Sequence, residues 1–236
     1  MRRFCSCECE DLTIRTVNLM LDMIIWAVMT AVFFVCLYIV YDGLKVTQSA
    51  VLGNEILAYA PIDESIDLLS LRDINPDIVG WIRIFGTEIN YPVVQGSNND
   101  YYLARNYQRE FATAGSIFVD YRSDLRDDFL IIYGHRMSYG GMFTDVIKFK
   151  EQQFFDEHEF GELFIDGTKW KLDIVAFGLV RADNKVIYGL SEMALRDVLM
   201  RAIHVREVGK GRFLLLSTCD AQNKEMRDVL LARIME

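Results

Sequence analysis

Cysteine is scarce in this sequence, and the part of the chain beyond residue 41 contains a single one, Cys219. A lone cysteine has no second thiol in that part of the chain with which to form an intramolecular disulfide. Cys219 is therefore either a small buried core residue or a free thiol that is kept for chemistry. Repeats, low-complexity stretches and proline-rich linkers are also missing, which favours one domain after residue 41.

An excess of positive charge is missing as well. The chain has 25 lysines and arginines against 34 aspartates and glutamates, a net charge of −9. The first 41 residues hold three basic and four acidic residues, so the remainder has 22 against 30, a net charge of −8. This balance argues against a nucleic-acid partner.

Charged residues are absent from the nineteen residues Met23–Tyr41. At about 1.5 Å per residue, a helix of this length nearly covers the roughly 30 Å hydrocarbon core of a bilayer. A buried core helix would carry a polar face, and this run has none. A cleaved signal peptide would have a shorter apolar run and a small-x-small cleavage pattern. We therefore predict a transmembrane signal-anchor over residues 23–41.

Basic residues on either side of this run indicate its orientation. Arg2, Arg3 and Arg15 precede the run, and only Lys45 follows it closely. By the positive-inside tendency, residues 1–22 form a cytoplasmic tail. We expect a single-pass protein of the cell membrane whose large C-terminal part is extracellular.

The other cysteines lie in or before the predicted span. Cys36 falls inside it, and Cys5, Cys7 and Cys9 fall on the cytoplasmic tail. Three cysteines at alternate positions without a nearby histidine match no zinc-site spacing, so we expect no metal site. Acylation of a juxtamembrane cysteine is an alternative, and no catalytic role is expected for the cluster.

Residues 42–78 are predicted to form a linker and N-terminal accessory helices. Apolar residues recur there at helical spacing, at Leu57, Ile62, Ile66 and Leu69. Near Gly80 the periodicity changes from that of helices to that of strands. Residues 79–236 are therefore predicted to form the globular domain.

Short apolar runs rich in β-branched and aromatic residues predict strands throughout this domain. Turn residues at 86–88 and at Asp166–Gly167 predict two hairpins. Only two segments, 151–159 and 191–204, have a helical pattern. Many short strands with few helices are typical of a closed or nearly closed β-barrel. The predicted strands are 81–85, 89–94, 115–121, 129–134, 162–165, 169–180, 212–218 and 229–234.

Two apolar strands end in reactive side chains, one in His135 and the other in Cys219. Arg227 follows the cysteine by eight positions and opens the last strand. The other histidines are weaker candidates, because His158 lies in an acidic helical stretch and His204 lies near the end of a predicted helix.

Cysteine, histidine and arginine together suffice for acyl transfer. A cysteine attacks as its thiolate, which is a minor species at neutral pH when the pKa is near its usual value of about 8.5. An imidazole pairs with the thiolate and protonates the leaving amine. A guanidinium carries a permanent positive charge that stabilises the oxyanion.

Several stretches resemble class B sortases in content and in order. They are YPVVQGSNNDYYL, GSIFVDYRS, YGHRM followed by GGMF, LSTCD, and an arginine that opens the last strand. The resemblance covers residues 80–234. It implies a mainly β fold, a closed eight-stranded sortase β-barrel with short peripheral helices, so that residues 79–236 form the catalytic domain. The predicted helix 191–204 falls where class B sortases have an additional helix.

The resemblance also implies roles for single residues. The family's nucleophile falls on Cys219, its histidine on His135 and its arginine on Arg227. Arg233 competes for the last role, but it aligns with a position that is commonly a lysine in the family. Five weaker carry-overs shape the site or line the groove for the sorting signal: Asn99, Leu103, Ser217, Thr218 and Asp220. Asn99 has an alternative role as the cap of a helix that begins at Asp100.

The implied reaction is cleavage of a Pro-x-Thr-containing C-terminal sorting signal of a surface protein after the threonine. A thioacyl intermediate forms on Cys219, and an amine then resolves it. The amine belongs to a cell wall precursor or, in the alternative, to a lysine of a pilin subunit. No cofactor is required. A second C-terminal transmembrane segment and an aspartate–aromatic lid, typical of the pilin-polymerising class, are missing from the chain, which weakens the alternative.

Two further interpretations compete with this one. The first is another cysteine enzyme, such as a wall-cleaving peptidase or an L,D-transpeptidase. The latter usually keeps its histidine a few residues from the cysteine, whereas His135 and Cys219 are 84 positions apart. A non-enzymatic, anchored β-barrel that binds a wall component would bury Cys219 as a core residue. In that case Cys219→Ala would destabilise the domain and would otherwise leave the phenotype of the cell unchanged.

Overall fold

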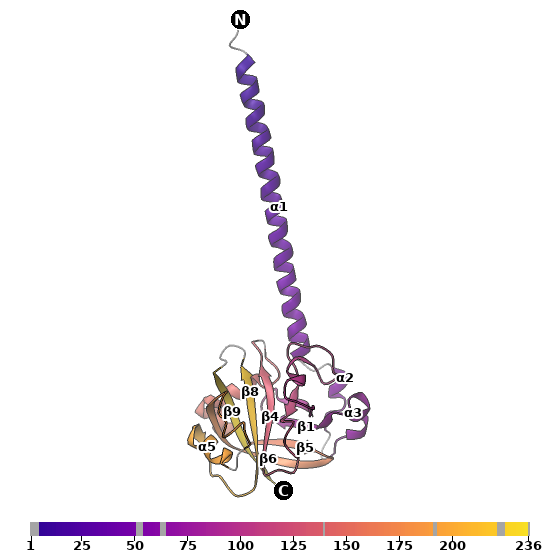
Figure 1. The fold of residues 1–236 in the computed structure, drawn as a ribbon, viewed down its shortest axis with the longest axis vertical. Coiled ribbons are helices and arrows are strands. Elements are labelled where there is room, and N and C mark those ends of the chain that lie inside the picture. The colour runs from indigo at the N-terminus through magenta and orange to yellow at the C-terminus, as the bar shows by residue number, and fades with distance from the viewer. Residues whose placement is uncertain are drawn as a thin grey trace. The chain divides into compact units, whose positions relative to one another are not determined.

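The computed structural model describes residues 5–50, 54–61, 65–138, 140–190, 193–220 and 225–235 (Figure 1). The chain divides into two compact units, residues 1–45 and 46–236. The strands that carry the candidate site all lie in the second unit.

A long helix, α1 (Cys5–Ala50), makes up the described part of the first unit and continues into the second. Its stretch Arg15–Leu44, of 30 residues, is apolar enough and long enough to cross a membrane, and none of it is buried within the protein. The predicted span, residues 23–41, lies inside this stretch. The same helix continues to Ala50, within the range 42–78 where a linker was expected.

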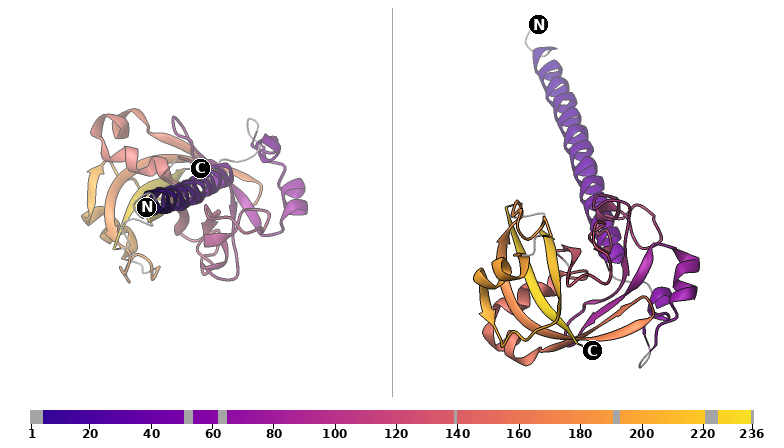
Figure 2. Two further views of the ribbon diagram at one scale, coloured as in Figure 1. Left: turned by 90° about the horizontal axis from the view of Figure 1, so that it is seen from above. Right: turned by 60° about the horizontal axis from the view of Figure 1, so that its bottom comes forward.

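Nine strands of the described residues form one sheet. Eight of them pair in the order β5-β1-β2-β3-β4-β8-β9-β6, and the pairing of β5 with β6 closes the ring. The predicted closed eight-stranded barrel is therefore confirmed, and its curved strands can be followed in Figure 2. The strands are β1 (Ile78–Ile84), β2 (Asn90–Val94), β3 (Ile117–Val119), β4 (Phe129–Arg136), β5 (Phe160–Ile165), β6 (Thr168–Arg181), β7 (Ala202–Val205), β8 (Arg212–Asp220) and β9 (Met226–Met235).

Both predicted hairpins are present. Strands β1 and β2 pair antiparallel around the turn at 86–88, and β5 and β6 pair antiparallel around Asp166–Gly167. The φ angles of Asp166 and Gly167 are 50° and 77°. Positive φ at both central residues is the geometry of the hairpin turn that Asp-Gly pairs favour.

The helix predicted over 191–204 is shorter than expected, and its second half is a strand. Helix α5 spans Ala194–Met200, and β7 (Ala202–Val205) follows it and pairs with β6. A Cβ on Gly178 of β6 would lie 2.9 Å from the carbonyl oxygen of Arg201. Because Gly178 has no Cβ, β7 can approach β6 closely, and this long-range contact outweighs the helical pattern of the segment.

The other helices are short. Helix α3 begins after Asp67, whose side chain accepts a hydrogen bond of 3.0 Å from the backbone N–H of Ser70. Helix α4 lies within the predicted helical segment 151–159. The remaining helices are α2 (Asn54–Leu57), α3 (Leu68–Ile74), η1 (Tyr101–Ala104), η2 (Thr144–Lys150) and α4 (Gln152–Glu157).

Two of the three described apolar positions predicted in the accessory helices, Leu57 and Leu69, are exposed instead of packed against the domain. Leu69 is 79% exposed and Leu57 is 39% exposed, whereas their neighbours Leu68 and Ile56 are buried. Apolar residues lie on both sides of these short helices, so contact with the barrel decides which side is buried. Of the other two predicted positions, Ile66 packs against the same cluster as Leu68, and Ile62 lies outside the described residues.

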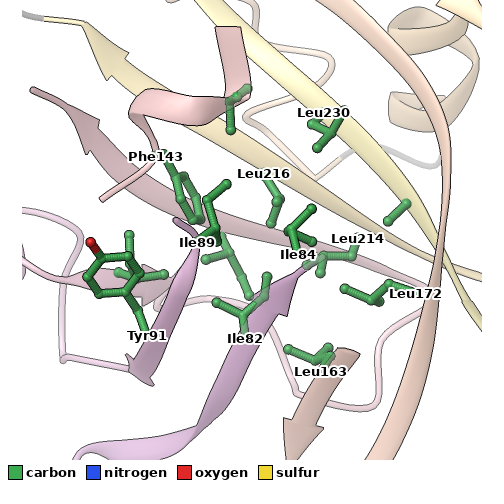
Figure 3. Packing of buried hydrophobic residues seen from close by; sticks show 14 of the residues in the cluster. Ile82, Ile84, Ile89, Tyr91, Phe143, Leu163, Leu172, Leu214, Leu216 and Leu230 are labelled. Carbon is green, nitrogen blue, oxygen red and sulfur yellow. The ribbon is translucent and has the colours of Figure 1, made fainter. Parts of the chain in front are cut away.

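Three clusters of buried side chains hold the second unit together. The largest fills the interior of the barrel and includes Ile82, Leu163, Leu214 and Leu230, from four different strands (Figure 3). A second cluster lies on the outer face of β4, β8 and β9, beneath α5 and residues 182–190. A third lies on the outer face of β1 and β3, against α2 and α3.

Candidate active site

Strands β4 and β8 run parallel and place the histidine and the cysteine beside each other. Their register pairs Phe129 with Phe213 at one end and His135 with Cys219 near the other. Residues 129–132 of β4 and 213–216 of β8 are apolar, because one face of these strands fills the barrel and the other is covered by the second cluster. His135 thus lies where the full burial of β4 ends.

Strand β9 brings the arginine to the same end of the sheet. Strands β8 and β9 pair antiparallel, and the last pair of their register is Ser217 with Val229. Two positions beyond this pair, β8 reaches Cys219 and β9 reaches Arg227. The side-chain oxygen of Thr218 accepts a hydrogen bond of 3.0 Å from the backbone N–H of Asp228, which continues the contact between the strands past the last pair.

Alternation along the strands assigns the site to the outer face of the barrel. Leu216 and Leu230 point into the barrel, whereas Leu215 and Leu231 belong to the outer cluster. Side chains alternate between the two faces along a strand, so Ser217 lies on the same outer face as Leu215, and Arg227 on the same outer face as Leu231. The structure describes Cys219 and Asp220 by their backbone only.

His135 is half-buried and held by a backbone carbonyl. Its Nε2 lies 2.7 Å from the carbonyl oxygen of Leu103 in η1. A carbonyl oxygen only accepts hydrogen bonds, so Nε2 carries a hydrogen in this arrangement. The ring is thereby oriented, and Nδ1 is the nitrogen whose protonation distinguishes imidazole from imidazolium.

Gly115 fixes the segment that supplies this carbonyl. Its φ angle is 61°, and a Cβ at this position would lie 2.7 Å from the carbonyl oxygens of both Tyr102 and Leu103. Next to it, the N–H of Ser116 donates a hydrogen bond of 3.0 Å to the Tyr102 carbonyl. Glycine is needed here because no side chain fits between η1 and the start of β3.

A cavity of about 300 Å³ opens at this end of the sheet. Four of the residues predicted to serve the site line it, and they come from three separate parts of the chain: Asn99, Leu103, Ser217 and Arg227. The other lining residues are Asp100, Phe118, Arg122, Tyr133, Ala182 and Tyr188. Apolar rings and aliphatic groups with a few polar atoms are typical of ligand sites.

Asn99 is anchored by its side-chain amide and does not cap a helix. Its Nδ2 donates a hydrogen bond of 3.0 Å to Asp120, and its Oδ1 accepts one of 3.0 Å from the N–H of Tyr121. The N-cap of η1 is Asp100, and the turn before it is held by Asn98, whose Oδ1 accepts hydrogen bonds from the N–H groups of Asp100 and Tyr101. The capping alternative for Asn99 is therefore wrong.

Ser217 and Thr218, the two residues before Cys219, face opposite sides of the sheet. Ser217 is 1% exposed, and its hydroxyl lies 3.0 Å from the hydroxyl of Tyr188. Thr218 is fully buried, is not among the residues that line the cavity, and contacts the backbone of β9. Ser217 thus contributes to the cavity wall, and Thr218 ties β8 to the strand that carries Arg227.

A cluster around Asp120 was not predicted, although GSIFVDYRS and YGHRM contain three of its four members. Asp120 is fully buried and accepts hydrogen bonds from Arg122, Tyr133 and Asn99. Burial alone would raise the pKa of Asp120, but these hydrogen bonds outweigh it and hold the pKa below its usual value. Burial, and then the Asp120 charge, raise the pKa of Tyr133, and the hydrogen bond to Asp120 raises that of Arg122. Tyr188 also lines the cavity and was not predicted, because its segment has no recognisable sequence pattern.

The competing histidines and the competing arginine lie in other surroundings. The His158 ring stacks on Phe154, and its Nδ1 lies 2.8 Å from the Phe154 carbonyl oxygen. The Nε2 of His204, in β7, lies 2.7 Å from the carbonyl oxygen of Lys150. Arg233 forms an ion pair of 2.6 Å with Asp173, and its strand position pairs with the first residues of β8.

Among the described residues, no cluster of ligand side chains could hold a metal ion.

Comparison with known sequences gives two relatives of the same name. No protein-family model matches the chain. The sortase B of Listeria monocytogenes is 36% identical over 169 residues, which cover 66% of this chain and 68% of that protein. The sortase B of Staphylococcus aureus is 33% identical over 182 residues, which cover 71% of this chain and 74% of that protein.

Solved structures share the fold. Clostridium perfringens sortase B has a TM-score of 0.64 and 31% identity, and the match covers 72% of this chain and 100% of that one. A Staphylococcus aureus sortase B–substrate complex has a TM-score of 0.62 and 31% identity, covering 71% and 84%. A Streptococcus pyogenes class B sortase involved in pilus biogenesis has a TM-score of 0.65 and 28% identity, covering 71% and 97%.

Proposed function

Because this chain belongs to the sortase B family of cysteine transpeptidases, we propose that it cleaves a Pro-x-Thr-type sorting signal and transfers the protein to an amine. In this proposal Cys219 is the nucleophile, His135 the general acid and base, and Arg227 the oxyanion ligand. The acceptor is the amine of a cell wall precursor. The observation that carries the assignment is the register that pairs His135 with Cys219 across two parallel strands.

The first half of the reaction uses the three residues in sequence. The thiolate of Cys219 attacks the carbonyl carbon of the threonine, and the positive charge of Arg227 stabilises the oxyanion that forms. The carbon–nitrogen bond then breaks, and His135 gives its Nδ1 proton to the leaving amine. The hydrogen bond between Nε2 and the Leu103 carbonyl supports this assignment, because it orients the ring and assigns proton transfer to Nδ1.

The second half reverses the proton flow. An incoming amine attacks the thioacyl carbon, His135 takes its proton, and the Cys219 thiolate leaves as the new amide bond forms. Nothing else is consumed, because the energy of the cleaved amide bond is retained in the thioacyl intermediate. This balance explains why a cysteine, a histidine and an arginine suffice for the transfer.

The cavity lined by Asn99, Leu103, Tyr188 and Ser217 is the proposed site for the sorting signal. It adjoins the Arg227 position, so a bound peptide has its threonine carbonyl near the guanidinium. The Staphylococcus aureus relative has been solved as a substrate complex, which supports a substrate site in this fold.

Helix α1 is the proposed membrane anchor, with the second unit outside the cell. Its apolar stretch Arg15–Leu44 is long enough to span a bilayer. We expect the full chain to sediment with membranes and to resist extraction by high salt, and a chain without residues 1–41 to stay in the supernatant. Full-length chain in the supernatant would contradict the anchor.

The proposed reaction is tested with the full chain in detergent, incubated with a small library of Pro-x-Thr peptides. Mass spectrometry is expected to show a thioacyl adduct on the protein and, after an amine is added, the peptide joined to that amine. A folded protein that forms neither species with any peptide would contradict the proposal. Peptides in which alanine replaces the threonine serve as the control and are expected to form no adduct.

A pilin amine is the second candidate acceptor. It is supported by the Streptococcus pyogenes class B sortase involved in pilus biogenesis, which is 28% identical to this chain. The same assay distinguishes the two acceptors if it offers an oligoglycine or diaminopimelate amine beside a lysine-containing peptide. Preferential transfer to the lysine side chain would assign the chain to pilin joining.

A further inference from the structure

Asp120 is a buried carboxylate beside the cavity, and it connects two of the cavity's walls. It follows β3 in the chain and is fully buried. Its Oδ2 accepts hydrogen bonds of 3.0 Å from Asn99 Nδ2 and 3.0 Å from the Tyr133 hydroxyl. Asn99 and Tyr133 both line the cavity, one from the loop before η1 and the other from β4.

Arg122 connects the same carboxylate to the third wall. Its Nε lies 2.9 Å from Asp120 Oδ1, and its Nη2 lies 2.7 Å from Asp120 Oδ2. The same Nη2 donates a hydrogen bond of 2.6 Å to the carbonyl oxygen of Tyr188. The planar guanidinium thus holds a carboxylate on one side and a backbone carbonyl on the other.

Tyr188 belongs to residues 182–190, which separate β6 from α5 and cover the outer cluster. Its hydroxyl lies 3.0 Å from the Ser217 hydroxyl, two residues before Cys219. Its ring lies 6.3 Å from the Tyr133 ring, measured between centroids. The Tyr188 side chain therefore forms part of the cavity wall, next to Tyr133 and Ser217. The position of the Tyr188 backbone decides where its ring and hydroxyl lie.

A fully buried carboxylate is costly for stability, and apolar packing serves a core as well or better. Buried charged networks are retained where they hold groups in one geometry. Here the groups that Asp120 and Arg122 hold are cavity-lining residues from three segments that are distant in sequence. The hydrogen bonds of the charged pair go to Asn99, Tyr133 and the Tyr188 carbonyl, which assigns the pair to the cavity.

We propose that Asp120 and Arg122 are positioning residues that hold Asn99, Tyr133 and the Tyr188 segment at the spacing that binds the sorting signal. The inference rests on the proposed function, because it takes the cavity to be the peptide site. It assigns to the pair a role in substrate affinity and none in acyl transfer. Arg122 is suited to this task, since its planar fork places Nε and Nη2 on the two Asp120 oxygens at once, and a lysine offers a single nitrogen on a flexible stem.

The test measures kcat and KM of the full chain in detergent for a cleaved peptide, in Arg122→Gln and Arg122→Lys. Loss of hydrogen bonds to a charged group predicts a KM increase of about 10-fold to 100-fold in Arg122→Gln, with kcat within about threefold of the parent. Arg122→Lys is expected to recover only part of the affinity. The matched control is Arg126→Gln, which removes an exposed arginine from the same loop and is expected to change neither constant.

Hydrogen exchange of residues 182–190 tests the structural half of the inference without any substrate. We expect faster exchange of these backbone amides in Arg122→Gln than in Arg126→Gln, and unchanged exchange in β8. If the parent protein cleaves no peptide, the proposed function fails, and the exchange result still decides whether Arg122 holds the segment. If the parent is active but Arg122→Gln has an unchanged KM, or loses only kcat, the inference is overturned.

Discussion

Cys219→Ala is expected to reduce transfer to the assay background, a loss of at least about 10⁴-fold, because no other group in the site can form the thioacyl bond. The substitution replaces a thiol by a methyl group at the end of β8, so the barrel core formed by the preceding residues stays filled. The mass of the variant should remain that of the free protein after incubation with peptide. Product formation and adduct mass are both measured.

Two comparisons make this result specific. Cys36→Ala removes one exposed thiol of α1, and we expect that variant to keep the activity of the parent protein. Thermal unfolding of Cys219→Ala should match that of the parent to within a few degrees. An inactive variant that unfolds at the same temperature supports the nucleophile. A variant that is destabilised yet still transfers peptide would return Cys219 to the role of a core residue.

Arg227→Lys is expected to lower kcat by about 10²-fold to 10³-fold with a much smaller change in KM. Loss of one oxyanion donor has this magnitude in acyl-transfer enzymes, because the interaction exists only in the transition state. A lysine keeps the charge but has a compact ammonium on a flexible stem instead of a planar group with several donors. Steady-state kinetics with a cleaved peptide separate the two constants.

Arg233→Lys is the matched control on the same strand. Arg233 pairs with Asp173 at 2.6 Å and belongs to the end of β9 that pairs with the start of β8. We expect its replacement to leave kcat near that of the parent. Loss of kcat in Arg233→Lys together with a normal Arg227→Lys would reverse the assignment of the two arginines.

The strands and the hairpins were largely predictable from the sequence. Alternation of apolar and polar residues and the Asp166–Gly167 turn depend on contacts within a few residues, so a local pattern records them. β7 was not predictable in this way, because four residues after a helix carry little periodicity. Its conformation depends on β6, in which Gly178 leaves room for the neighbouring strand.

The phase of the accessory helices also required the tertiary structure. Leu68 and Leu69 are adjacent and equally apolar, and nothing in the local sequence states which of them faces the barrel. In a helix of two turns, neighbouring apolar residues allow either side to be buried. Contact with the third cluster decides the matter in favour of Leu68 and Leu71.

For the candidate site, the sequence by itself determined which reactive side chains are proposed: a lone cysteine and a histidine that end apolar strands, and an arginine that opens the last strand. Only the tertiary structure decided that β4 and β8 run parallel with His135 beside Cys219, and that Asn99, Tyr133 and Tyr188 meet around Asp120 and Arg122. The physical reason is that reactivity belongs to a side chain, whereas register and the hydrogen bonds of a buried charge depend on segments far apart in the chain.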